Sequence, residues 1–182
     1  MSGIDDNEKK LAELILYVSQ KCALEPRFGA VKLNKILYFA DFFAYGSWGR
    51  AITGAEYQHL PNGPAPRRLL PVRKKLVEGG DLALQPTPLS GGKVQHRTVN
   101  LREPDLSLFD GREIALVDSM IDQLKSLNAD ETSELSHQMV GWEITRDYET
   151  IEYGTIFLSN PPLTPGEVLK GQSLAREMNM LA

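Results

Sequence analysis

The hydrophobic residues of this chain recur at helical spacing close to its N-terminus. Between positions 7 and 24, apolar residues recur at the i, i+3, i+4, i+7 spacing: Leu11, Leu14, Ile15 and Val18. This spacing predicts an amphipathic helix with one buried face. Pro26 and Gly29 follow, and these two residue types end helices.

The stretch from residue 31 to residue 45 is hydrophobic on nearly all sides. Phe39 and Phe42 widen its apolar stripe until little polar surface remains. A helix of this kind normally lies at the centre of a domain. We therefore expect a buried central helix over residues 31–45 that ends near Gly46.

The remaining pattern predicts shorter helices. A third helix is expected to start near Arg67, with Pro71 in its first turn, where a missing N–H costs little. Further apolar spacing predicts helices after Asp110, over residues 132–140 and over residues 166–178. Residues 151–158 fit an extended segment or a loop.

Residues 82–101 predict a β-hairpin, because two short alternating runs flank Gly91 and Gly92. The expected fold class is therefore α+β and mainly α: a compact helical domain around a buried central helix, with one small antiparallel hairpin. A chain of 182 residues is expected to form a single domain, here spanning residues 1–182.

Composition fits a soluble cytoplasmic protein. Charged residues are 24% and the net charge is −4, which argues against a dedicated nucleic-acid binder. No apolar run approaches the ~20 residues of a membrane span, and the acidic N-terminus is unlike a signal peptide. The single cysteine, Cys22, fits a reducing compartment, and we expect it to be buried and inert.

A search for catalytic chemistry finds little. His59, His96 and His137 do not stand in metal-ligand spacing, and the phosphate-binding and nucleophile motifs are absent. We therefore expect no catalytic residue, no metal site and no cofactor. His137 is interpreted as a structural histidine bonded to backbone; the alternative is a polar contact in a pocket with Trp142 and Tyr38.

Basic residues offer two further candidates. Lys32 and Lys35 lie one turn apart on the central helix, and we expect them to reach solvent, although a partner could also engage them. A basic group over residues 67–75 lacks interleaved aromatic residues, so it is a weak nucleic-acid signal.

Three motifs stand in a fixed order along the chain. The first is Lys-Leu-Asn-Lys-Ile-Leu-Tyr-Phe-Ala-Asp at 32–41, the second is Ile-Thr-Gly-Ala-Glu-Tyr at 52–57 followed by Gly-Pro, and the third is Leu-Ser-His at 135–137 followed by a tryptophan. Together they resemble the SocA-like antitoxins, the Panacea domain family, over about residues 8–145. The family-motif positions are Lys32, Lys35, Tyr38, Gly63, Pro64, His137 and Trp142.

The resemblance implies an antitoxin that neutralises a cognate protein toxin by direct contact and carries no catalytic site. The alternatives are an adaptor that delivers a toxin to a AAA+ protease, as one family member does, and a DNA-binding regulator of its own operon. Phage-associated members also exist. The motif positions are expected to hold the fold or to line a shared groove.

A neutralising surface needs aromatic and arginine anchors. The candidates for contact with the toxin lie near the end of the central helix and the start of the third: Tyr45, Trp48, Arg50, Arg67 and Arg68. The sequence leaves open whether Trp48, beside glycines, is such an anchor or fills the core.

Overall fold

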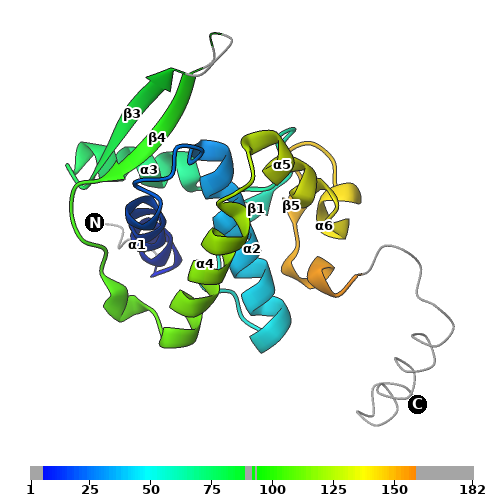
Figure 1. The fold of residues 1–182 in the computed structure, drawn as a ribbon. Helices are drawn as coiled ribbons and strands as arrows, with labels where there is room; N and C mark the ends of the chain where they lie inside the picture. Colours follow the sequence, from blue (N-terminus) through cyan, green and yellow to red (C-terminus); the bar gives the residue numbers. More distant parts are fainter. Residues whose placement is uncertain (1–5, 89–91, 93, 159–182) are drawn as a thin grey trace, which may run out of the picture.

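The computed structural model describes residues 6–88, 92 and 94–158 (Figure 1). Its helices are α1 (Asp6–Lys21), α2 (Ala30–Trp48), α3 (Leu69–Glu78), α4 (Gly111–Leu124), α5 (Ala129–His137) and α6 (Val140–Glu143). The 3₁₀ turn η2 (Leu106–Leu108) precedes α4, and the 3₁₀ turn η3 (Tyr153–Phe157) follows β5. The strands are β1 (Tyr57–Gln58), β2 (Ala65–Pro66), β3 (Leu82–Pro88), β4 (Val94–Asn100) and β5 (Thr150–Ile151). The predicted mainly helical α+β class is confirmed, while the helix predicted over 166–178 lies outside the described residues.

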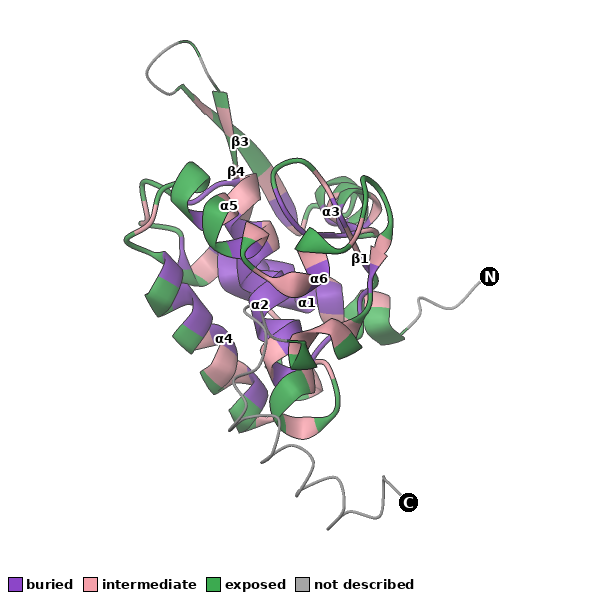
Figure 2. Cartoon of the chain, turned by 90° about the vertical axis from the view of Figure 1, so that its right-hand side faces the viewer, coloured by how far each residue is buried: buried purple, intermediate pink, exposed green. Residues whose placement is uncertain are grey.

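Helix α2 forms the centre of the fold, as predicted. Figure 2 shows it as a mainly buried rod surrounded by the other elements. It contacts α1, α4, α5, β2, β4 and η3, and Leu33, Leu37 and Phe42 on it are inaccessible to solvent. Each such side chain contributes about 1.5–3 kcal/mol when fully buried, so α2 supplies a large part of the hydrophobic stabilisation.

Helix α2 is longer than predicted. It continues through Gly46 to Trp48 and ends at Gly49, which adopts a left-handed φ of 73° and donates its N–H to the Tyr45 carbonyl at 2.8 Å. Gly46 is not a stop signal but a packing position, because a Cβ there would lie 3.2 Å from Cγ1 of Ile156 in η3. The prediction that the helix ends near Gly46 is therefore wrong.

The C-terminal part of the described chain also differs from the sequence prediction. The helix predicted over 132–140 begins earlier, because Asn128 caps α5 and forms a reciprocal capping box with Glu131. It ends at His137, and a separate short helix, α6, begins at Val140. The stretch from 151 to 158 combines the end of β5 with the 3₁₀ turn η3.

The starts of α3 and α4 agree with prediction. Pro71 is the third residue of α3, inside the first turn, where it breaks no helical hydrogen bond. Asp110 caps α4, and its carboxylate accepts from the backbone N–H groups of Arg112 and Glu113.

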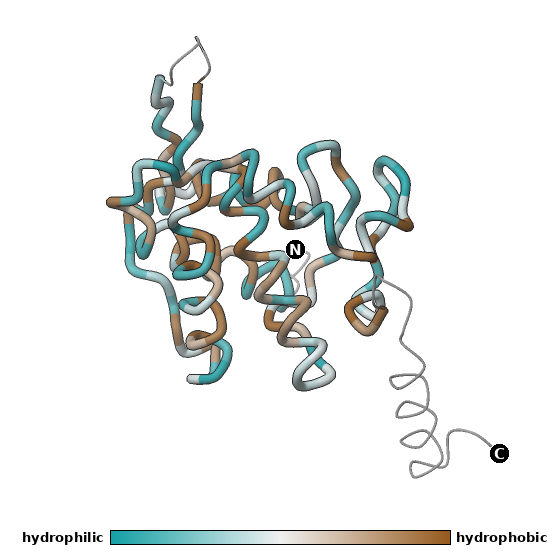
Figure 3. The backbone as a smooth tube through the Cα atoms, turned by 45° about the vertical axis from the view of Figure 1, so that its right-hand side comes forward, coloured by the Kyte–Doolittle hydropathy of each residue, from teal (hydrophilic) through white to brown (hydrophobic). Residues whose placement is uncertain are grey.

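The two sheets are small and antiparallel. β1 lies between β2 and β5, which brings the segment before α3 beside the segment after α6. The hairpin β3–β4 pairs Leu82 with Asn100 at its base and Pro88 with Val94 at its far end. It projects from the helical body (Figure 1), and its distal part is mainly hydrophilic (Figure 3).

The buried carboxylate of Asp41 ties a loop to the central helix. It accepts hydrogen bonds from the Thr53 backbone N–H at 2.7 Å and from the Tyr57 hydroxyl at 2.8 Å. Burial raises the pKa of Asp41, while the hydrogen bonds from Thr53 and Tyr57 favour the ionised form. The residues between α2 and β1 are thereby fixed against the core.

None of the helices in the described part of the chain is both long enough and apolar enough to cross a membrane.

We expect Asp41→Ala to lower the free energy of unfolding by about 3 kcal/mol, because it leaves the buried Thr53 N–H and Tyr57 hydroxyl without an acceptor. Urea denaturation measures this loss. Asp122→Ala is the control, since Asp122 is an exposed α4 carboxylate whose described ion pair is with Lys125, and its cost should stay below about 0.5 kcal/mol. Equal effects for the two variants would contradict the assigned role of Asp41.

Candidate functional site

The family-motif residues from three distant segments meet at one place. We use the name motif cluster for Lys35, Gly63, Pro64, Ser136, His137 and Trp142. Lys35 comes from α2, Gly63 and Pro64 from the turn before β2, Ser136 and His137 from the end of α5, and Trp142 from α6. The cluster joins the first half of α2 to the turn before β2 and to the α5–α6 segment.

Lys35 is the buried polar centre of the motif cluster. Its side chain is almost inaccessible, and its Nζ donates a hydrogen bond of 3.1 Å to the Pro64 carbonyl oxygen. Loss of hydration lowers the pKa of Lys35 to about 7. A substantial fraction of this lysine is therefore neutral near physiological pH.

Gly63 allows the turn to approach Lys35 closely. Its φ is +91°, a left-handed conformation that glycine adopts without steric cost. A Cβ at this position would lie 2.3 Å from Oγ of Ser136 and 2.7 Å from Cε of Lys35. The Gly-Pro motif is thus explained by geometry: glycine gives the space, and Pro64 supplies the carbonyl that Lys35 binds.

Trp142 packs against two imidazoles. The ring of His137 stacks on it with centroids 3.9 Å apart, and the ring of His59 stacks on it with centroids 4.3 Å apart. The Trp142 indole N–H donates to the Leu60 carbonyl at 3.2 Å. These contacts fix α6 to the strand β1 region.

His137 combines features of both interpretations made from the sequence. It hydrogen-bonds the Pro61 backbone and stacks on Trp142, while its Nε2 is buried and has no hydrogen-bond partner among the described residues. Burial, aided by the nearby Lys35, lowers the pKa of His137. Tyr38 does not join this stack, because its ring packs against Phe42 instead.

The prediction that Lys32 and Lys35 reach solvent is wrong. Both are buried, with exposed fractions of 2% and 1%. Lys32 donates to the Lys125 carbonyl at 3.1 Å, so the end of α4 covers one lysine and the turn around Pro64 covers the other. Local sequence could not indicate this cover, since the covering segments are distant along the chain.

The motif cluster does not have the geometry of a nucleophilic site. The Ser136 hydroxyl donates to the Ser133 carbonyl at 2.7 Å, so its proton is directed to the backbone rather than to a general base. Within residues 6–88, 92 and 94–158, no group of three or more histidine, cysteine or acidic side chains could hold a metal ion. Cys22 is buried, and loss of hydration raises the pKa of its thiol to about 11, which disfavours the reactive thiolate.

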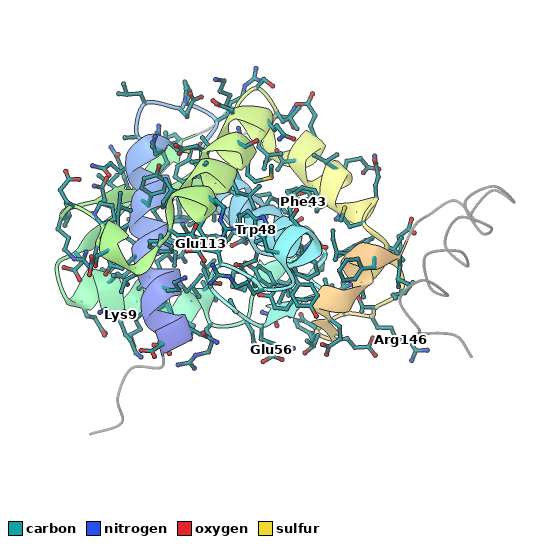
Figure 4. All side chains as sticks on the ribbon, turned by 90° about the horizontal axis from the view of Figure 1, so that it is seen from below. Lys9, Phe43, Trp48, Glu56, Glu113 and Arg146 are labelled. Carbon is teal, nitrogen blue, oxygen red and sulfur yellow. The ribbon has the colours of Figure 1, made fainter. Side chains whose placement is uncertain are left out.

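The candidate partner residues on α2 lie at its C-terminal end but face different neighbours. Tyr45 is half-buried and stacks on Tyr153 of η3 at 5.3 Å. Trp48 is also half-buried: it packs against the core, and the guanidinium of Arg112 lies 5.3 Å from its ring centroid. Trp48 lies inside α2 rather than in a loop, and Figure 4 shows it on the side of the molecule that also carries Glu113.

The three candidate arginines are all engaged within the chain. Arg50 is exposed and pairs with Asp110 at 2.9 Å. Arg67 donates to Glu56 at 3.1 Å and to the Tyr148 carbonyl at 3.1 Å, which clamps β1 to the segment before β5. Arg68 pairs with Glu8 at 3.0 Å.

These contacts place the five candidates in four different surroundings: η3, the start of α4, the small sheet and the start of α1. Tyr45, Trp48 and Arg50 lie at or just after the C-terminal end of α2, whereas Arg67 and Arg68 lie just before α3.

Sequence reasoning missed one exposed aromatic residue beside them. The ring of Phe157 lies 6.0 Å from that of Tyr45 and is 65% exposed. Nothing in the local sequence separates Phe157 from a core phenylalanine, because its exposure depends on how η3 packs across α2. His59 was also missed as a stacking partner of Trp142, for the same reason.

Comparison with known proteins identifies the class. Residues 33–143 match the family described as antitoxin SocA-like, Panacea domain, and the chain belongs to this family. The matched range contains every residue of the motif cluster. No curated protein and no solved structure matches the chain.

Gly63→Ala should cost about 3 kcal/mol or more, because it adds a steric clash with Ser136 and Lys35 to the strain of a left-handed alanine, which alone is worth about 1–2 kcal/mol. Gly80→Ala is the matched control: Gly80 has φ +75° and no atom within 4 Å of the added Cβ. Thermal or urea unfolding of both variants measures the difference. If Gly80→Ala costs as much as Gly63→Ala, close packing at Gly63 is not the reason for glycine there.

The lowered pKa of Lys35 predicts a pH-dependent stability. The folded-state pKa of about 7 lies below the ordinary value of 10.5, so between these values the unfolded chain binds more protons and stability rises with pH. The contribution of Lys35 to the free energy of unfolding is lowest below pH 7, and above pH 7 it rises by up to about 1.4 kcal/mol per pH unit.

The measurement is urea unfolding of the wild type and of Lys35→Met between pH 7 and pH 9. The wild type should gain stability relative to the variant as pH rises. Parallel profiles would show that Lys35 remains charged in the folded protein.

Proposed function

We propose that this protein is an antitoxin that neutralises a cognate protein toxin by direct binding. The observation that carries the proposal is the match to the SocA-like antitoxin family over residues 33–143. The name of the family concerns antitoxins as a class, and direct neutralisation is our inference for this chain.

The geometry of the motif cluster supports a binding role over a catalytic one. Lys35, Ser136 and Trp142 all bond to backbone carbonyls of the chain itself. These residues hold the fold together, so the partner would be met by exposed residues elsewhere. The protein is accordingly proposed to act without catalysis.

The surface we favour for contact with the toxin lies at the C-terminal end of α2. It consists of Tyr45, Trp48, Arg50 and Phe157, of which the two aromatic residues Tyr45 and Phe157 are neighbours. Aromatic and arginine side chains are enriched among residues that dominate binding energy. Arg67 and Arg68 remain weaker candidates, because their internal bonds to Glu56 and Glu8 would have to be exchanged for bonds to the partner.

DNA binding is the less favoured alternative. Lys75 and Arg68 both pair with Glu8, and Lys74 pairs with Glu78, so much of the basic group over 67–75 is neutralised locally. Binding to DNA depends on cationic groups that are free to replace counterions. The adaptor alternative shares the toxin contact and differs only in the fate of the bound toxin.

We further propose that residues 1–182 form one domain of this family and that the protein works in the cytoplasm. Support for one domain comes from α1 and Ile151, which lie outside the matched range but contribute Leu14, Ile15 and Ile151 to the same buried core as α2. The single cysteine is compatible with a reducing compartment.

Co-expression of this chain with the product of the neighbouring gene tests the proposal. We expect restored growth and a complex that co-purifies at near-equal amounts. Tyr45→Ala/Phe157→Ala should weaken the complex by about tenfold or more while the protein still folds, since about 1.4 kcal/mol corresponds to tenfold. Leu24→Ala/Leu101→Ala, two exposed apolar residues outside α2, η3 and the start of α4, is the control.

The half-life of the toxin separates the two modes of action. Direct neutralisation leaves the half-life unchanged or longer, whereas an adaptor shortens it in cells that contain the protease. The proposal fails if the neighbouring product neither binds this chain nor loses toxicity in its presence.

A further inference from the structure

The hairpin β3–β4 has one blocked edge and one open edge. Leu101 donates its N–H to the Asp81 carbonyl just before the hairpin, so these two residues form a hydrogen-bonded pair. In an antiparallel ladder every second pair from there is hydrogen-bonded and the pairs between are not. Pro86 therefore lies opposite His96, and Pro88 opposite Val94, in non-hydrogen-bonded pairs.

In non-hydrogen-bonded pairs the main-chain groups point away from the partner strand. On β3 the outward positions at Pro86 and Pro88 have no N–H to offer. On β4 the outward groups of Val94 and His96 are complete, and no backbone hydrogen bond reaches them from other described segments. Only β4 can accept another strand along its full distal part.

A groove of about 630 Å³ runs beside this open edge. Its wall on the hairpin side is formed by residues 94–96 of β4, with no residue of β3. Its opposite wall is formed by the first residues of α2 and of α5. The volume falls within the range of about 300–1,000 Å³ that is typical of binding pockets.

The groove favours a negatively charged occupant. Its charged side chains include Arg27 and Lys32 against a single carboxylate, Asp130. The N-terminus of α2 also faces it, and no side chain caps that helix, which leaves partial positive charge there.

Lys32 is the strongest sign of a missing partner. Its side chain is 2% exposed and lines the groove, yet it forms no salt bridge with any described carboxylate. Its one described hydrogen bond goes to the Lys125 carbonyl at 3.1 Å, although an ammonium group carries three donors. Glu25 and Glu131 favour the charge of Lys32 only from a distance. A buried cation with no carboxylate in direct contact is costly, and a bound carboxylate would offset that cost.

We propose that β4 and this groove bind an extended, acidic peptide segment of the toxin. The segment adds to the outward edge of β4 through the main chain of Val94 and His96. One of its carboxylates reaches Lys32. This inference builds on the proposed function, because it assigns to the same partner a second contact surface in addition to the one at the C-terminal end of α2.

The first test uses the free chain and a synthetic probe: a capped six-residue peptide of alternating threonine and valine with one central glutamate. In amide NMR spectra we expect millimolar peptide to shift Val94 and His96 more than residues of β3. A probe with glutamine in place of glutamate should bind several-fold more weakly. Lys32→Met should remove this difference between the two probes.

His96→Pro removes an outward N–H and should therefore weaken binding of the probe by about tenfold. The variant should still fold, because proline is tolerated at an edge position. Leu84→Pro is the matched control, since Leu84 occupies the same kind of outward position on the other strand. Protection of the Val94 and His96 amides against hydrogen exchange in the free chain would overturn the inference, because the edge would then already be occupied.

The second test uses the complex with the toxin. Strand addition should protect the Val94 and His96 amides against hydrogen exchange when the complex forms. If the complex forms and these amides stay unprotected, the groove is not the contact and the antitoxin proposal stands. If the probe binds at β4 but no toxin complex forms, the proposed function fails and the peptide-binding edge stands. If the probe causes no shifts and no complex with the toxin forms, the inference is overturned as well.

Discussion

The fold depends on the cost of placing a helix with charged residues at its centre. α2 is covered by protein along most of its length, so the charged side chains of Lys32, Lys35 and Asp41 are buried away from water. Lys32, Lys35 and Asp41 must therefore find partners inside the chain, and each finds them on a different segment. Because an unsatisfied buried polar group costs about 1–3 kcal/mol and a buried charge more, these few bonds select which segments cover which part of α2.

This constraint explains why the family motifs have the residues that they have. Lys35 needs an acceptor, and the Pro64 carbonyl provides it only because Gly63 lets the turn pass so close. Ser136 fills the space beside Gly63, and Trp142 secures the same turn through the Leu60 carbonyl. The motifs are thus one packing unit, and a change in one member affects the others.

Much of the fold could be predicted from the sequence. The buried α2, the hairpin and the start of α4 after Asp110 follow from periodicity and turn residues, which are local signals. The predicted helix ends are wrong where a tertiary contact overrides a local preference, or where a capping signal lies outside the apolar pattern. Gly46 stays inside a helix because η3 packs against it, and α5 starts at Asn128 because of a capping box that the apolar spacing did not show.

Much less of the candidate site could be predicted. The convergence of Lys35, Gly63 and His137 depends on how segments far apart in sequence are paired, and a single sequence does not record that pairing. The exposure of Phe157 and the burial of Lys32 are opposite to what their residue types suggest. Side-chain chemistry indicates which residues need a partner, and only the arrangement in space shows whether the partner is present.

The prolines of β3 also bear on self-association. A hairpin with two open edges can stack repeatedly and grow into a fibril. Here Pro86 and Pro88 stop growth on one side, so a second copy could join only through β4. Such pairing occupies the open edge of each described hairpin and gives a closed dimer. The hairpin can thus pair with a strand of another protein, while its repeated addition to copies of itself is limited.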